Sequence, residues 1–106
     1  MLRHMVLFNL KPDVAASERD ALFDQVRKLS DIGSVRSLAI TRLLEPADPE
    51  YRDHMSSEFG YALLIEFDDE AGLYAYQKEP DHVTVGQEIR KHVSAIKVMD
   101  FVATDS

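Results

Sequence analysis

Cysteine and tryptophan are both absent from this sequence of 106 residues, and glycine occurs only four times. Without cysteine the chain has no disulfide, no thiolate nucleophile and no sulfur ligand for zinc. The longest apolar runs, residues 5–8 and 61–65, are far shorter than the roughly 20 residues of a membrane-spanning helix. The first residues lack a small-residue cleavage site, so we expect a β-strand there and no signal peptide.

Signatures of cofactor and metal chemistry are missing as well. The sequence has no glycine-rich phosphate loop, no serine-centred nucleophile elbow and no His-Glu-x-x-His helix. Asp48, Glu50, Asp53 and Glu58 form an acidic cluster, but they lack the glycine and the spacing of a calcium loop. We interpret them as solvated charges and expect neither a metal site nor a cofactor.

Basic residues are in the minority, with 12 Lys and Arg against 19 Asp and Glu and a net charge of −7. Such a surface repels a phosphate backbone, so nucleic acid is not an expected partner. Hydrophobic residues make up 45% and charged residues 29% of the chain, which is typical of a globular protein. We therefore expect a single cytoplasmic domain over residues 1–106 that does not interact with membranes.

The apolar periodicity predicts a β-α-β-β-α-β order of elements. Strands are predicted over residues 4–10, 35–44, 60–67 and 94–102. A first helix is predicted over residues 18–30 with Ser17 in its cap. Pro80 splits the second helix into a segment that is capped by the acidic residues 68–70 and runs to Lys78, and a segment over residues 81–92. Residues 45–59 have no clear period and are predicted to be a loop. This order is typical of the ferredoxin-like α+β fold, a four-stranded antiparallel sheet with helices on one face.

The predicted strands are apolar on both faces. In the first strand Val6 and Phe8 point one way while Met5 and Leu7 point the other way. The second strand is expected to place Val35, Ser37, Ala39 and Thr41 on one side. Helices can cover only one face, and a large exposed apolar face is unusual for a monomer. We therefore expect a homodimer through the open sheet face, the alternative being a monomer in which the 45–59 loop covers that face.

Candidate catalytic residues flank the proline break. Tyr76 ends one predicted helix and His82 begins the next, so the break can turn both side chains toward one cavity over the sheet. A phenol and an imidazole can together move a proton and polarise a carbonyl group. A ligand pocket is predicted around them, lined by four further side chains on the same faces: His4, Val6, Phe8 and Ile89. The alternative is that Tyr76 fills the core and His82 caps the helix junction.

Several segments in this order resemble the stress-responsive dimeric A/B barrel (Dabb) family. They are the opening segment 4–12, the strand 60–67 with the acidic pair after it, Ala75-Tyr76-Gln77, Pro80-Asp81-His82, and the closing segment 96–101. The resemblance covers residues 2 to 102. It implies a ferredoxin-like protomer whose sheet packs on the sheet of a second copy, which gives a dimeric α/β barrel.

The resemblance also implies candidate chemistry. A plant member of the family closes a linear polyketide by aldol condensation without a metal or an organic cofactor. Its catalytic tyrosine and histidine align with Tyr76 and His82, and a further pocket histidine aligns with His4. Another pocket histidine aligns with Leu63, and a histidine common in the family before the proline is Glu79 here, so this chain departs from that site.

Three functions stay open at this point. The first is a homodimer of uncertain activity with a pocket for a small hydrophobic or aromatic ligand. The second is a cofactor-independent, cyclase-like enzyme that acts on a β-keto or polyketide-type substrate with Tyr76 and His82 as its acid/base pair. The third is a monooxygenase-like relative, for which the sequence has no positive sign.

Overall fold

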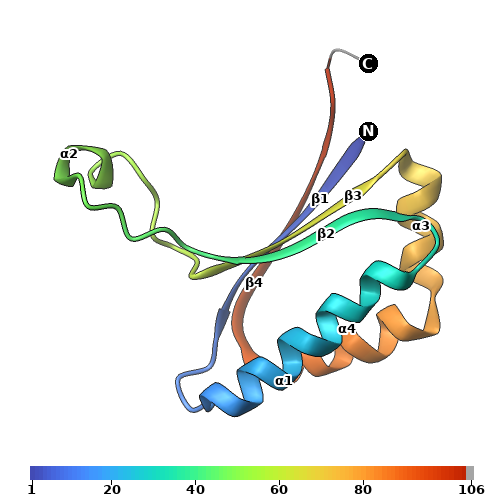
Figure 1. Cartoon of the computed structure of the whole chain (residues 1–106), viewed down its shortest axis with the longest axis horizontal. Helices are drawn as coiled ribbons and strands as arrows, with labels where there is room; N and C mark the ends of the chain where they lie inside the picture. Colours follow the sequence, from blue (N-terminus) through green and yellow to red (C-terminus); the bar gives the residue numbers. More distant parts are fainter. Residues whose placement is uncertain (105–106) are drawn as a thin grey trace.

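The computed structural model describes residues 1–104. Its four strands form one antiparallel sheet in the order β2-β3-β1-β4, and the longer helices pack on one side of this sheet (Figure 1). The elements in chain order are β1 (Leu2–Leu10), α1 (Ala16–Arg27), the 3-10 helix η1 (Lys28–Asp31), β2 (Val35–Arg42), α2 (Pro49–Arg52), β3 (Tyr61–Phe67), α3 (Glu70–Lys78), α4 (Pro80–His92) and β4 (Val93–Val102). The predicted ferredoxin-like β-α-β-β-α-β fold with a split second helix is confirmed.

The hydrophobic core lies between the sheet and the helices. Alternate residues of β3 point inward and are almost inaccessible, with exposed fractions of 1% for Ile65 and 0% for Phe67. Leu22, Val26 and Leu29 bring the apolar side of α1 and η1 into the same core. This inner face of the sheet therefore holds both the core and any site enclosed beneath the helices.

The start of α1 differs from the prediction. The helix is capped at Ala15, and Ser17 lies inside its first turn. The Glu18 carboxylate accepts a hydrogen bond of 3.2 Å from the backbone N–H of Ala15, so the acidic residue ties the helix to the preceding chain and no serine cap forms. At α3 the acidic cap is confirmed, because the Asp69 carboxylate accepts from the backbone N–H of Gly72 at 3.0 Å.

Strand β2 carries a β-bulge that the sequence pattern did not predict. Val35 pairs with Phe67, but the next pair is Ser37 with Glu66, so Arg36 is an extra residue in the ladder. One extra residue inverts the side-chain alternation of the strand. Val35 is therefore on the buried inner face, and the prediction that it shares a side with Ser37 is wrong.

The 45–59 segment is not entirely a loop. It contains α2, whose cap Asp48 accepts a hydrogen bond of 3.0 Å from the backbone N–H of Glu50. This segment extends beyond the sheet at the end opposite α3 (Figure 1). The outer sheet face keeps exposed apolar side chains, including Leu64 and Met99. In residues 1–104 no helix has the length and hydrophobicity to cross a membrane.

Candidate active site

A cavity of about 260 Å³ lies between the inner sheet face and α4. It forms at the β4 side, where the helices leave inner-face residues such as Ile96 and Val98 partly exposed. Its wall combines apolar side chains with five polar ones: Val6, Leu29, Leu63, Ile89, Ile96 and Val98, together with Gly86, and His4, Tyr76, Gln77, His82 and Arg90. The cavity is mostly apolar with a few convergent polar groups, which is the usual composition of a small-molecule site.

Tyr76 and His82 meet at this cavity. Glu79 has an extended backbone between α3 and α4, and Pro80 begins the new helix, so the chain turns between the two residues. The two ring centroids are 4.4 Å apart. The Tyr76 side chain is only 2% exposed, and its hydroxyl has no hydrogen-bond partner among residues 1–104. Burial raises the pKa of Tyr76, so the phenol stays protonated and can donate a hydrogen bond to a ligand.

His82 is arranged to be a neutral base. Burial lowers the pKa of His82, and the opposing effect of the Gln77 carbonyl is smaller. The imidazole is therefore neutral at pH 7. Its Nδ1 atom lies 3.3 Å from the Gln77 carbonyl oxygen and, as the donor to that carbonyl, carries the proton. The Nε2 atom then has the free lone pair and can accept a proton from a ligand.

His4 is held by a residue that the sequence analysis did not single out. Its Nδ1 atom lies 2.6 Å from a carboxylate oxygen of Asp100, the residue that pairs with it across β1 and β4. A carboxylate at Nδ1 fixes the orientation and the tautomer of an imidazole. The His4 ring is also edge-on to Tyr76, at a centroid distance of 6.2 Å. His4 and Asp100 are 96 positions apart in the sequence, so only the strand register brings them together.

The remaining predicted pocket residues divide into two groups. Val6 and Ile89 line the cavity with His4, Tyr76 and His82. Phe8 lies farther along β1, where its ring stacks on Tyr61 at a centroid distance of 5.4 Å, and it does not line the cavity. Two residues of a strand span roughly 7 Å, which is enough to carry Phe8 into the core beside α1.

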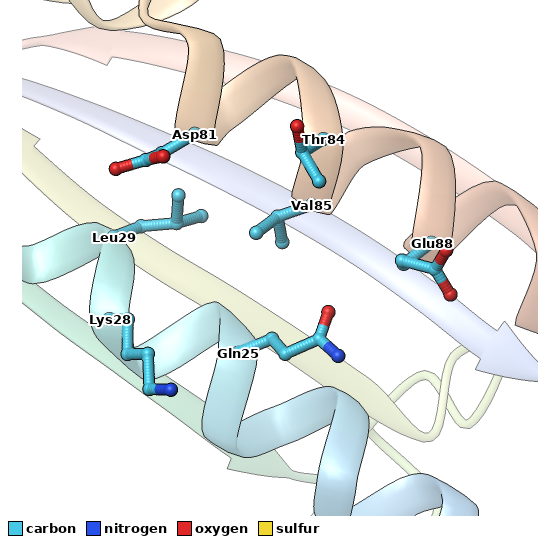
Figure 2. A pocket seen from close by; sticks show the side chains of 7 residues that line it. All are labelled: Gln25, Lys28, Leu29, Asp81, Thr84, Val85 and Glu88. Carbon is cyan, nitrogen blue, oxygen red and sulfur yellow. The ribbon is translucent and has the colours of Figure 1, made fainter.

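A second cavity, of about 410 Å³, lies between α1 and α4. Figure 2 shows Leu29 and Val85 at its base, and the longer polar side chains around them. Its lining has no histidine or tyrosine: Gln25, Lys28, Leu29, Asp81, Thr84, Val85 and Glu88. Lys28 and Asp81 are exposed, and the half-buried Glu88 already pairs with Lys91 at 3.0 Å, so the cavity with Tyr76 and His82 is the better candidate site.

Within residues 1–104 no group of three or more histidine and carboxylate side chains is arranged to hold a metal ion. The acidic side chains of the 45–59 segment form no such group either, and the Asp48 carboxylate caps α2.

The sheet order and the split second helix define a ferredoxin-like domain. The family model described as Stress responsive A/B Barrel Domain matches residues 2–103. The chain belongs to this family, which confirms the resemblance found in the sequence. No curated protein matches the chain.

Solved structures support the same fold. A Dabb family protein with a ferredoxin-like fold from Mesorhizobium loti is 26% identical, with a TM-score of 0.77 over 96% of this chain and 95% of that chain. A dimeric ferredoxin-like protein of unknown function from Thermobifida fusca is 21% identical, with a TM-score of 0.77 over 96% and 90%. A hydroxynitrile lyase from Passiflora edulis is 16% identical, with a TM-score of 0.83 over 99% and 94%. At the lower identities the likeness is one of fold.

Proposed function

We propose that this chain binds a small carbonyl compound in the cavity beneath α4 and catalyses a proton transfer next to the carbonyl group. The observation that carries the proposal is the Tyr76–His82 pair, whose rings lie 4.4 Å apart at the wall of the cavity. One member is a protonated phenol and the other a neutral imidazole. General acid–base catalysis at a carbonyl compound needs these two protonation states together.

The two residues have distinct roles in this reaction. The Nε2 atom of His82 takes a proton from the carbon beside the carbonyl group, and the C–H electron pair moves into an enolate. The Tyr76 hydroxyl donates a hydrogen bond to the enolate oxygen as its negative charge develops. The imidazolium then returns a proton to carbon. His4, oriented by Asp100, supplies a second imidazole at the same wall.

The cavity favours a compact ligand. Its volume of about 260 Å³ is below the roughly 300–1,000 Å³ typical of pockets for drug-sized ligands. An apolar cavity of roughly 150 Å³ already accepts benzene, so a single ring with a short side chain fits. A cyclase would begin with the same proton abstraction and then form a carbon–carbon bond, but a long polyketide chain fits this volume less well.

The proposal is tested by hydrogen exchange on a one-ring ketone. Methyl 4-oxo-4-phenylbutanoate is incubated in D₂O with the protein, and proton NMR follows the loss of the signal beside the ketone. The wild type is expected to accelerate exchange, and His82→Ala to lose that acceleration by roughly 100-fold or more. Tyr76→Phe removes only the hydroxyl and is expected to lose roughly 10-fold or more.

A matched control separates the site from other histidines. His54 lies in the 45–59 segment and is exposed, so His54→Ala is expected to keep the wild-type rate. Exchange that is no faster with the wild type than without protein contradicts the proposed catalysis, as does full activity of His82→Ala.

We further propose that the chain is a homodimer through the open sheet face. Leu64 and Met99 flank Met5 in one row across the outer face, and their exposed fractions are 36% and 45%. A groove of about 450 Å³ is hollowed in the same face. Packing this face on a second copy removes its apolar surface from water. Three structural neighbours are described as dimeric, which supports a dimer, and we propose that it is cytoplasmic, as the composition predicts.

A further inference from the structure

We infer that the ligand of this cavity carries a carboxylate group and that Arg90 binds it. This inference rests on the proposed function, because it names the substrate class of the same cavity. Arg90 lies on α4 after His82 and Gly86, and all three residues line the cavity. Their spacing of four residues places them along one side of the helix. Arg90 is thus on the same wall of the cavity as the proposed base.

Arg90 is exposed to solvent and has no counter-charge among the residues that the structure describes. In contrast, Arg3, Arg19, Arg27 and Arg36 each form an ion pair with an aspartate or glutamate. Among residues 1–104 Arg90 has neither a hydrogen bond nor an ion pair, and no aspartate or glutamate lines its cavity. A guanidinium presents a planar fork of donors that matches the two oxygens of a carboxylate. A ligand carboxylate would give the Arg90 guanidinium an ion-pair partner.

The positive charge of Arg90 acts on the cavity. Burial is the main cause of the lowered pKa of His82; His4 lowers that pKa further, and the positive charge of Arg90 adds the smallest effect in the same direction. The chain as a whole has a net charge of −7, so its general surface repels an anion. A carboxylate ligand therefore needs a positive group close to it. Arg90 is the one residue of the cavity wall whose side chain is permanently charged.

Gly86 leaves room for the body of such a ligand. A Cβ atom added at Gly86 would have no other atom within 4 Å, so the helix has open space between His82 and Arg90. Glycine is a poor residue for the middle of a helix, and here its missing side chain widens the cavity. The apolar side chains of Ile89, Ile96 and Val98 line the same space. The site thus fits an oxo acid with one ring, its carboxylate at Arg90 and its ketone at Tyr76.

The test uses two probes that differ in charge and in one methyl group. These are 4-oxo-4-phenylbutanoate and its methyl ester, whose binding is measured by titration calorimetry at low salt. The wild type is expected to bind the acid roughly 10-fold more tightly than the ester, as a charge-assisted hydrogen bond at a partly exposed site would give. Arg90→Gln is expected to abolish this preference by weakening binding of the acid alone. Arg90→Lys keeps the charge and is expected to restore part of it.

Arg42→Gln is the matched control. Arg42 lies on β2, outside this cavity, and has no ion pair among residues 1–104, so the variant makes the same change in net charge. It is expected to keep the preference for the acid. The inference is overturned if Arg90→Gln retains the preference or if Arg42→Gln loses it to the same extent.

The two proposals fail in different ways. Equal binding of acid and ester by the wild type overturns the role of Arg90 and leaves the carbonyl-binding cavity in place. Binding of neither probe overturns both proposals. Unchanged binding of the ester by Arg90→Gln shows that the variant keeps a folded cavity, so a loss confined to the acid supports the carboxylate contact.

Discussion

The two faces of the sheet differ sharply although the same strands supply both. On the inner face Phe67 is inaccessible to solvent, whereas on the outer face Phe101 is 49% exposed. Both faces are apolar, so composition does not distinguish them; the helices do, because they cover only one face (Figure 1). The cavity with Tyr76 and His82 lies where that cover is incomplete, beside β4. The site is thus a gap in the packing of the inner face.

Truncating a phenylalanine on each face is expected to give the largest contrast. Phe67→Ala removes a ring packed against Tyr76 at a centroid distance of 5.2 Å, and we expect a loss of about 3–5 kcal/mol in the free energy of unfolding. Phe101→Ala is expected to cost less than about 1 kcal/mol. Urea unfolding at low protein concentration, where a dimer contributes least, measures both. Equal losses would mean that the faces are equally packed.

A charge on the outer face is expected to break the dimer. Leu64→Glu places a carboxylate in the apolar row that faces the second copy, so we expect a change from dimer to monomer in light scattering after size exclusion. Leu44→Glu is the control, because Leu44 is also exposed, at 61%, but follows the end of β2. Its mass is expected to stay that of a dimer. A dimeric Leu64→Glu protein would contradict the proposed interface.

Substitutions at two helix glycines, Gly86 in α4 and Gly72 in α3, test the difference between the open and the packed parts of the space over the inner sheet face. Gly86→Ala is expected to raise the free energy of unfolding by about 0.5–1 kcal/mol, since alanine favours the helix and the added methyl group meets no atom. A Cβ at Gly72 would lie 3.5 Å from Phe67. Gly86→Leu is therefore expected to fold and lose ligand binding, whereas Gly72→Leu is expected to be destabilised. Thermal unfolding and titration calorimetry distinguish the two losses.

The smallest expected effect is on the protonation of His82. Burial lowers its pKa, so its NMR titration midpoint is expected below pH 6.5, the ordinary value. The unfolded chain binds this proton at higher pH than the folded chain does. His82 therefore reduces stability as the pH falls below 6.5, and exchange catalysis is lost as the imidazole is protonated. Arg90→Gln is expected to move the midpoint upward, and an unchanged midpoint would place Arg90 away from the ring.

Sequence periodicity predicted most of the fold because side-chain alternation and proline constraints are local. Residues 60–67 were predicted to be a strand, and β3 spans Tyr61–Phe67. Local patterns did not reveal the bulge at Arg36 because it depends on pairing between two strands. A second error of the local patterns was the predicted cap at Ser17. The helix begins earlier, where the Glu18 side chain accepts a hydrogen bond from the backbone N–H of Ala15.

The candidate site was partly accessible from sequence. Tyr76 and His82 could be paired because they lie only six positions apart, on either side of the break at Pro80. Asp100 could not be assigned to His4, since only the β1–β4 register sets them opposite each other. Phe8 was predicted at the pocket by alternation, but alternation says which face a side chain takes and not how far along the strand it lies.

Local sequence preferences account for the order of elements, the apolar character of both sheet faces and the proximity of Tyr76 to His82. These features follow from backbone preferences and hydrophobic periods over a few residues. Long-range packing accounts for the enclosure of His4 beside Asp100, for the space at Gly86 and for the lack of an ion-pair partner of Arg90 within residues 1–104. Such features depend on how α4 packs over the edge of the sheet, and packing joins residues whose separation along the chain carries no local signal.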